Sequence, residues 1–260
     1  MKTTYKVLIS FCIGVTLIAI GVSMGGLSQM RLDFFNHFDW RWDAERINDV
    51  DYQTTNSIYE FDIDIHSGTV KFIESDNDRV EVKANTVYDG FEVYQTGNTL
   101  VINQAHYWKW FRSYDRSQIE IYVPKDMTIQ KAKLNANAGS LKVYDLKSDS
   151  VEFNVGAGNL SIENVKCQDM KLDVGMGNAN ADNVLIQDTI KISVGMGNTD
   201  VELIGNEDDF NYKAKVGLGS VKIGDEKITS LGNEKSNHGT TDRMIDINCG
   251  MGRVKVDMEG

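Results

Sequence analysis

The stretch Val174–Asn178 reads VGMGN, and the same five residues return at Val194–Asn198. A near copy, VGAGN, occupies Val155–Asn159. A phosphate-binding loop is a single glycine-rich turn that leads into a helix, commonly with a lysine. Strand-like residues follow each copy here, so the sequence argues against a nucleotide site and favours a structural repeat.

The repeat extends well beyond these three copies when segments are aligned on the second glycine of each pair. Successive aligned glycines are separated by about 20 residues, except for a clearly longer final step. That step contains GDEKITSLGNEKSNHGTTDR, a polar stretch that indicates a loop inserted into one unit. An earlier and looser copy, FDIDIHSGTVKF, occupies Phe61–Phe72. The aligned positions are Gly139, Gly158, Gly177, Gly197, Gly219 and Gly252.

Apolar and polar residues alternate within each unit, as in Leu172, Val174 and Met176. A period of two predicts strands rather than helices. A unit of about 20 residues cannot bury its own apolar side, whereas stacked units can. We therefore expect an all-β fold, a single-stranded β-solenoid that resembles a parallel β-helix. A propeller blade would need about 40 residues, and a calcium-binding nonapeptide solenoid would need a nine-residue period.

The residue between the two glycines forms a column for which the alternation predicts an inward direction. Burial of each large member would contribute roughly 1.5–3 kcal/mol, so Met196→Asp is expected to destabilise the domain strongly. The glycines themselves either tolerate positive φ or crowding at a corner, or leave an external groove for a ligand backbone. The column consists of Ala157, Met176, Met196, Leu218 and Met251.

Asn159, Asn178 and Asn198 each follow the second glycine of a pair. Stacked rungs would place them in a polar ladder, which either only hydrogen-bonds along the corner or forms a binding row. These three residues are therefore candidate binding residues.

An uncharged apolar segment, Val7–Leu27, follows Lys2 and Lys6. Its length of about 20 residues matches that of a membrane-spanning helix; a cleaved signal peptide is the alternative. Basic residues on both sides leave the positive-inside comparison undecided. The signal-like layout predicts a single-pass protein of the cell membrane whose C-terminal domain is extracellular. We expect three parts: 1–30 as cytoplasmic tip and transmembrane anchor, 31–58 as aromatic juxtamembrane linker or cap, and 59–260 as β-solenoid ectodomain.

Acidic residues dominate the part of the chain after residue 30, with 38 acidic against 25 basic residues and a formal charge of about −13. Such a field repels nucleic acid and favours cations or cationic peptides. We therefore expect no nucleic-acid partner. Cys167 and Cys249 lie far apart in the sequence, and they could pair only if the fold brings them together.

Strand-like runs between residues 59 and 123 are expected to continue the solenoid or to form a sandwich-like cap on it. They are interrupted by AHYWKWFRSYDR, residues 105–116. Aromatic residues and arginine are enriched at interaction hot spots, so this segment is either a binding loop or a cover for the solenoid's edge. Its candidate binding residues are Tyr107, Trp108, Trp110 and Arg112.

The sequence contains no constellation with recognisable catalytic roles. A Gly-x-Ser-x-Gly elbow is absent, and none of the four histidines has a metal-type partner two to four residues away. A solenoid lyase or hydrolase would need clustered acids or bases in a groove. We therefore expect a protein that is not an enzyme and that has no cofactor, no catalytic residue and no metal site.

Two runs of sequence, IYVPKD at Ile121–Asp126 and LNANAGSLKVYDL at Leu134–Leu146, come before the repeated Gly-x-Gly units. With these turns and the apolar N-terminal segment, residues 59–260 resemble a bacterial cell-envelope family described as an adhesin-like domain of unknown function. The resemblance implies a β-solenoid ectodomain on bacterial, often Gram-positive, surfaces, and relatives linked with envelope stress and antimicrobial-peptide responses. The commoner unit of that family has Ser or Thr before a single glycine and Asp after it, whereas this chain has Gly-x-Gly-Asn.

These observations predict a membrane-anchored surface protein with a binding or structural, adhesin-like role in the bacterial envelope. Its ligand would be an envelope component or a protein. The alternative is an envelope-stress component that captures cationic peptides or signals to a membrane partner.

Overall fold

The computed structural model describes residues 46–55, 57–66, 68–88, 90–104, 117–137, 139–229, 233–237 and 241–260. All of them belong to one compact unit, Ala44–Gly260. The described chain is almost wholly β-structure, with one short 3₁₀ helix, η3 (Glu207–Asp209), so the predicted all-β class is confirmed there. The predicted anchor, Val7–Leu27, lies outside the described residues, among which no helix is long and apolar enough to cross a membrane.

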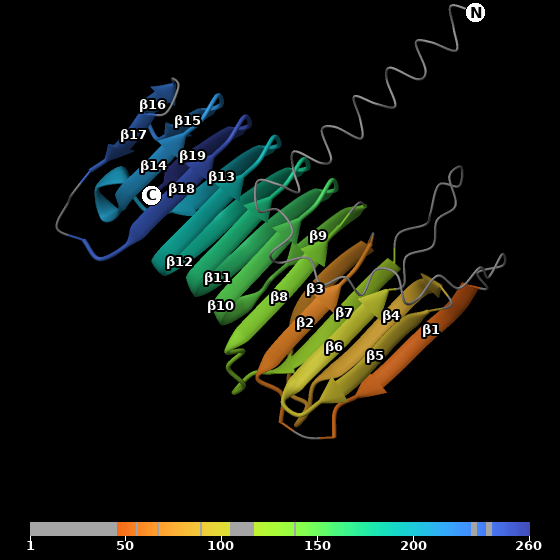
Figure 1. Cartoon of the computed structure of the whole chain (residues 1–260). Helices are drawn as coiled ribbons and strands as arrows, with labels where there is room; N and C mark the ends of the chain where they lie inside the picture. The colour runs from red at the N-terminus through yellow and green to blue at the C-terminus, as the bar shows by residue number, and fades with distance from the viewer. Residues whose placement is uncertain are drawn as a thin grey trace, which may run out of the picture. The chain divides into compact units, whose positions relative to one another are not determined.

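The strands form two faces, which we call face 1 and face 2, joined at a stacked row of corners (Figure 1). The long strands β11 (Asn159–Val174) and β12 (Asn178–Val194) pass from face 2 into face 1. Face 1 contains, besides their second halves, β17 (Asn233–Ser236), β14 (Asn211–Val216), β18 (Met244–Cys249), β10 (Lys147–Val155), β8 (Lys131–Ala136), β2 (Glu60–Asp64), β6 (Thr99–Gln104) and β5 (Phe91–Thr96). Face 2 contains, besides their first halves, β16 (Glu226–Thr229), β15 (Ser220–Ile223), β19 (Arg253–Glu259), β13 (Asn198–Ile204), β9 (Ser140–Tyr144), β3 (Gly68–Ser75), β7 (Ser117–Pro124), β4 (Glu81–Tyr88) and β1 (Arg46–Gln53).

A single apolar core lies between the two faces. Within β10, Val151 and Phe153 are at most 1% exposed, whereas Glu152 between them points outwards. Phe153 lies in parallel register with Leu134 on one neighbouring strand and Leu172 on the other. Neighbouring strands are about 4.8 Å apart, so each inward side chain packs on its equivalents one rung away. The predicted solenoid of stacked rungs is therefore confirmed.

The residue between the two glycines points outwards, and the prediction that it faces the core is wrong. Met176 is 63% exposed and Met196 is 53% exposed. The strand alternation slips by one position at each corner, because Gly175 and Met176 both face outwards and Gly177 is buried. The inside of the corner has no room for a side chain, so the glycine takes the inward position. The expected strong destabilisation by Met196→Asp has therefore lost its basis.

The rungs stack in an order that differs from their order in the chain. A rung here means a face-1 strand, its corner and the face-2 strand that follows. The last rung of the sequence, β18–β19, lies between the rungs β12–β13 and β14–β15. At the other end, β2–β3 lies between β6–β7 and β8–β9. The two outermost rungs are therefore neither the first nor the last along the chain.

Antiparallel strands cover both ends of the stack of parallel rungs. β5 pairs with β6, and β4 and then β1 follow β7. At the other end β17 pairs with β14 and β16 with β15. The predicted inserted loop, Gly224–Arg243, thus supplies two capping strands, so its interpretation as a plain loop is wrong. Repeat folds need such atypical end units, because an open rung would expose apolar surface and unpaired backbone groups.

The runs predicted as strands between residues 59 and 123 are confirmed as β2 to β7. Two of these strand pairs, β2–β3 and β6–β7, are true rungs, and β4 and β5 are antiparallel additions. This region therefore combines the two predicted possibilities, a continued solenoid and a cap. β1 lies within the segment 31–58 that the sequence predicts as linker or cap.

Candidate binding edge

The Gly-x-Gly corners stack along one edge of the molecule, which we call the glycine edge. A Cβ atom added to Gly197 would lie 1.9 Å from the carbonyl oxygen of Gly177, and one added to Gly177 would lie 2.1 Å from that of Gly158. Real Cβ atoms do not approach backbone oxygen so closely. The described glycines with positive φ are Gly90, Gly97, Gly205 and Gly224, all outside these corners. Of the two predicted reasons for glycine at a corner, crowding is therefore confirmed and positive φ is not.

The backbone of the glycine edge is hydrogen-bonded from rung to rung. The N–H of Met176 donates to the carbonyl oxygen of Gly156 at 2.9 Å, and the N–H of Met196 donates to that of Gly175 at 2.8 Å. Met251 and Leu218 continue the series, with bonds of 2.7 and 2.8 Å to the glycine of the neighbouring rung. A backbone N–H outside a regular ladder needs a partner from the backbone, a side chain or water. Here the corner amides are satisfied by protein.

The predicted asparagine ladder is confirmed on the same edge. The side-chain amide of Asn178 donates to Oδ1 of Asn159 at 3.0 Å, and that of Asn198 donates to Oδ1 of Asn178 at 3.1 Å. All three residues are exposed. A side-chain amide has two N–H donors, and the ladder uses one in each donor residue, so the second can serve a ligand. A binding role for this row remains a prediction.

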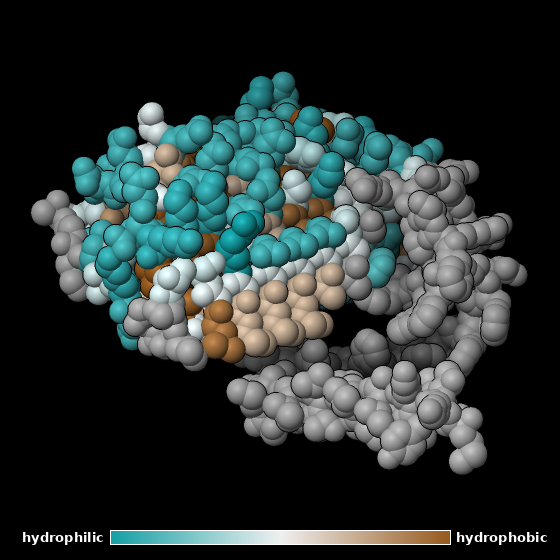
Figure 2. All heavy atoms as spheres, turned by 90° about the horizontal axis from the view of Figure 1, so that it is seen from above, coloured by the Kyte–Doolittle hydropathy of each residue, from teal (hydrophilic) through white to brown (hydrophobic). Residues whose placement is uncertain are grey.

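An exposed apolar row lies beside the asparagine ladder, and we call it the methionine row. It consists of the residues between the paired glycines, which occupy consecutive rungs. Figure 2 shows a continuous tan to brown strip along this edge of the molecule. The large members are 53–66% exposed, which makes them the most exposed large apolar side chains of the described chain. In spatial order the row is Ala157, Met176, Met196, Met251 and Leu218.

The opposite ends of the face-2 strands form a second corner, the asparagine edge, which the sequence analysis missed. Asp145, Asn164 and Asn183 have φ values of 59°, 59° and 56° there. Asn164 donates a hydrogen bond to Asp145 at 3.0 Å, and Asn183 donates to Asn164. Asn and Asp are the non-glycine residues that best tolerate this left-handed backbone. Each lies six residues after the second glycine of its unit in three successive units, and this recurrence is a signal that could have revealed them.

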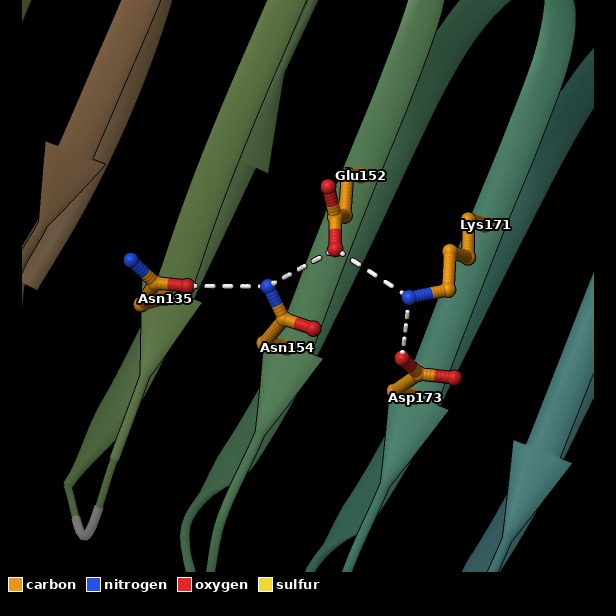
Figure 3. A network of polar contacts seen from close by, with 5 residues as sticks. All are labelled: Asn135, Glu152, Asn154, Lys171 and Asp173. Carbon is orange, nitrogen blue, oxygen red and sulfur yellow. Dashed lines mark hydrogen bonds and ion pairs between the residues drawn. The ribbon is translucent and has the colours of Figure 1, made fainter. Parts of the chain in front are cut away.

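Charged groups on the outer side of face 1 compensate one another across rungs (Figure 3). Lys171 lies 3.2 Å from Glu152 and 2.7 Å from Asp173, and Asn154 donates to Asn135 at 3.0 Å. Partial burial acts to raise the pKa of Glu152, but the hydrogen bond and charge of Lys171 outweigh it and hold that pKa below its usual range. The hydrogen bond to Asp173 raises the pKa of Lys171, although burial opposes the rise. The network thus keeps both partners charged.

Face 2 carries a less compensated acidic column on its outer side, near the asparagine edge. Glu163 lies opposite Asp182, and Glu202 lies opposite Asp257. Local desolvation raises the pKa of Glu202, and the carboxylates of Glu259, Asp182 and Asp257 add to the rise. Within the described part of the chain, the column forms ion pairs at its Asp257 end, with Lys222 at 3.7 Å and with Lys255. The column therefore concentrates negative charge on neighbouring rungs.

The remaining predicted positions form no second site within the described part of the chain. The loop candidates Tyr107, Trp108, Trp110 and Arg112 lie outside the described residues. Cys167 and Cys249 are both buried and unpaired, and burial raises the pKa of the Cys167 thiol to about 12. The described residues contain no group of three or more His, Cys, Asp or Glu side chains that could hold a metal ion.

The chain is similar to proteins of known structure at low sequence identity. No curated protein matches the chain. Among solved structures, a putative cell adhesion protein from Clostridium sporogenes is 16% identical, with a TM-score of 0.47, over 83% of this chain and 100% of that chain. A putative adhesin from Bacteroides fragilis is 15% identical, with a TM-score of 0.46, over 82% of this chain and 97% of that chain.

A family model described as Toastrack DUF4097 matches residues 58–202 and 125–257. The two matches overlap and together include every corner of the glycine edge. This confirms the resemblance to an adhesin-like domain of unknown function that the sequence indicated. Since the matched ranges cover most of its length, the chain belongs to the Toastrack DUF4097 family.

Proposed function

We propose that this protein is a membrane-anchored surface component of the bacterial envelope that acts by binding and not by catalysis. The observation that carries this proposal is the repetition of exposed groups along the glycine edge. Asn159, Asn178 and Asn198 present the same amide on successive rungs, each about 4.8 Å from the next. A rigid row of equal donors and acceptors suits an extended ligand with its own short repeat, such as a cell-wall polymer or a peptide strand.

The experiment is a retention assay of residues 31–260 on envelope fractions, because the described core runs from Ile58 to Val256 and stays intact in that fragment. We expect retention on at least one purified envelope polymer. Asn178→Ala should weaken retention, because it interrupts the row at its centre. Asn180→Ala is the matched control, since Asn180 is also exposed on β12 but bonds to Asp182 outside the row. Equal retention of both variants and the wild type would contradict a role for the row.

The acidic column supports a second candidate function, the capture of cationic peptides. Four carboxylates on adjacent rungs, with a formal ectodomain charge of about −13, would attract a chain with regularly spaced lysines. Titration calorimetry with a cationic amphipathic peptide at low and high salt tests this, with a Lys→Gln version of the peptide as the control. We expect binding that weakens with salt and in Glu163→Gln with Glu202→Gln. Binding that is insensitive to salt and to both substitutions would remove this candidate.

A further inference from the structure

The methionine row is exposed, although burial of large apolar side chains away from water lowers the free energy of the protein. Met176, Met196, Met251 and Leu218 are 63%, 53%, 57% and 66% exposed. They occupy four consecutive rungs, so the row is about 14 Å long between its first and last large members. Crowding accounts for the glycines on both sides of this position, but it does not require an apolar residue between them. The row therefore calls for a function outside the core.

The backbone N–H groups of the row are hydrogen-bonded within the protein. Each of these four residues donates its backbone N–H to a corner carbonyl of the neighbouring rung at 2.7–2.9 Å. The adjacent amides of Asn178 and Asn198 are likewise bonded to their neighbours. Unsatisfied backbone groups are what normally keep loops out of the apolar part of a bilayer. For the N–H groups of these four residues that obstacle is absent, because protein carbonyl oxygens accept their hydrogen bonds.

Charge is distributed unevenly between the two edges. The five-residue corner segments from Val155–Asn159 to Cys249–Arg253 contain a single charged residue, Arg253. The asparagine edge, in contrast, adjoins the acidic column that ends in Asp257 and Glu259. A bilayer with anionic lipids repels the acidic side of the molecule. It does not repel the glycine edge, whose corner segments carry one positive charge and no negative charge. The electrostatics thus favour an approach by the glycine edge.

The chain also enters the solenoid from the glycine edge. Arg46, the first residue of β1, pairs with Tyr88 near the end of β4. Three residues earlier in β4, Asn85 pairs with Gln118, the second residue of β7. Arg46 therefore lies at the same edge as the start of β7. Ser117 is in register with Gly68, and the starts of the face-2 strands continue from there to Ser220. Residues 28–45 separate Arg46 from Val7–Leu27, and a segment of that length spans at most about 60 Å. An anchor in Val7–Leu27 would therefore tether the solenoid to the bilayer through Arg46, which lies at this edge.

We propose that the methionine row is a lipid-contact element that inserts into the interface of the bilayer. The row would enter the boundary between headgroups and acyl chains, as the apolar face of an interfacial helix does. Arg253 would lie at the level of anionic headgroups, and the asparagine edge would point away from the membrane. The proposal rests on the anchored state of the proposed function, but a row that contacts lipid does not require any particular ligand.

The test uses the full chain in vesicles of phosphatidylethanolamine and phosphatidylglycerol, with nitroxide labels on single reactive cysteines. Cys167 and Cys249 are buried, so they label poorly. Cys12→Ser with Met196→Cys places the label on the row. Cys12→Ser with Ile204→Cys is the matched control, because Ile204 is an apolar residue, 38% exposed, at the other end of a face-2 strand. Collision rates are measured with oxygen, which enters lipid, and with a nickel chelate, which stays in water.

We expect the nickel collision rate at position 196 to be about threefold or more below that at position 204, with the oxygen rate raised. A second variant adds Met196→Asp and Met251→Asp to a label at Met176→Cys. These two carboxylates should return the label to water, while the unchanged melting temperature shows that the fold persists. Equal nickel access at positions 196 and 204 would overturn the proposal. Protection at 196 that persists without vesicles and rises with protein concentration would also overturn it, because a second copy would then cover the row.

Failure of the anchor gives a different result from failure of the row. In the wild-type chain the reactive cysteine is Cys12, within Val7–Leu27. A water-exposed label at Cys12 would contradict the anchor of the proposed function. Protection at position 196 would still establish lipid contact in that case, and exposure there with a lipid-buried Cys12 would refute only the row.

Discussion

The glycine edge lies at the start of the face-2 strands and the asparagine edge at their end. Both edges turn the chain from one face to the other, but they do so by opposite means. At the glycine edge the backbone keeps ordinary φ values, and the corner closes because the inward residue has no side chain. At the asparagine edge Asn164 and Asn183 adopt φ near 60°, and their side chains bond to the rung before. One corner depends on the absence of a side chain, and the other depends on a specific side chain.

This difference determines what each edge can display. At the glycine edge the second glycine of each pair occupies the inward position, and the residue before it points outwards. The identity of that outward residue is not restricted by the corner. The asparagine edge uses its outward side chains to hold the turn, so these side chains have little freedom for another role. A variable exterior on a fixed corner is therefore a property of the glycine edge.

Gly197→Ala is expected to have the largest effect, because the added Cβ would lie 1.9 Å from the carbonyl oxygen of Gly177. Separation of the two rungs should cost about 3 kcal/mol or more, since the nearest obstacle is the backbone of Gly177 and not a flexible side chain. The urea midpoint of unfolding measures this loss. Met196→Ala, one position earlier but outside, is the control and should leave the midpoint nearly unchanged. A small loss for Gly197→Ala would mean that the corner can open.

Asn164→Ala should have an intermediate effect at the other edge. Alanine in the left-handed region costs about 1–2 kcal/mol, and the hydrogen bond to Asp145 is lost as well. Asn164→Gly keeps the backbone conformation and removes only the side chain, so it should lose less. If both variants lost the same stability, the side-chain ladder and not the backbone would determine this corner.

Glu202→Gln should act through pH, because the pKa of Glu202 is raised from its ordinary value of 4.5 in the folded chain. A carboxyl with a raised folded pKa contributes stability at low pH, and this contribution is lost as the pH rises through that pKa. The variant should therefore be slightly more stable than the wild type at pH 7 and equal to it at about pH 4. Urea midpoints at the two pH values check this. An unchanged difference across the range would show that the carboxylates of the column do not interact.

Met196→Asp is expected to have the smallest effect on stability, within about 0.5 kcal/mol, because the side chain is exposed. The alternation of the sequence predicted the reverse. Thermal unfolding in vesicle-free solution measures it. A loss of several kcal/mol would mean that the row is covered in solution.

The sequence predicted the repeat, the strands and the core, because all three follow from strand alternation within a longer repeat of nearly constant length. Phe153 and Leu172 are buried where the alternation places them. The asparagine ladder also followed from the repeat alone, because equal positions on stacked rungs must meet. These features depend on local order along the chain.

Other features depend on contacts between rungs, and the sequence did not reveal them. The direction of Met176 follows from the distance between the corner of Gly177 and the carbonyl oxygen of Gly158, which no alternation rule contains. The place of β18 between β12 and β14 is equally invisible, because every rung offers nearly the same edge to its neighbours. The binding role of Tyr107, Trp108, Trp110 and Arg112 stays a prediction.

The interleaved order of the rungs has a consequence for folding during synthesis. The chain makes β14 and β15 before β18 and β19, yet both β14 and β15 gain their parallel partners only from those final strands. The C-terminal end of the stack therefore cannot be completed until the last residues have emerged. Loss of residues 244–260 would remove an inner rung and leave its outer neighbour without support. A chain truncated before Met244 would therefore leave β14 and β15 without parallel neighbours.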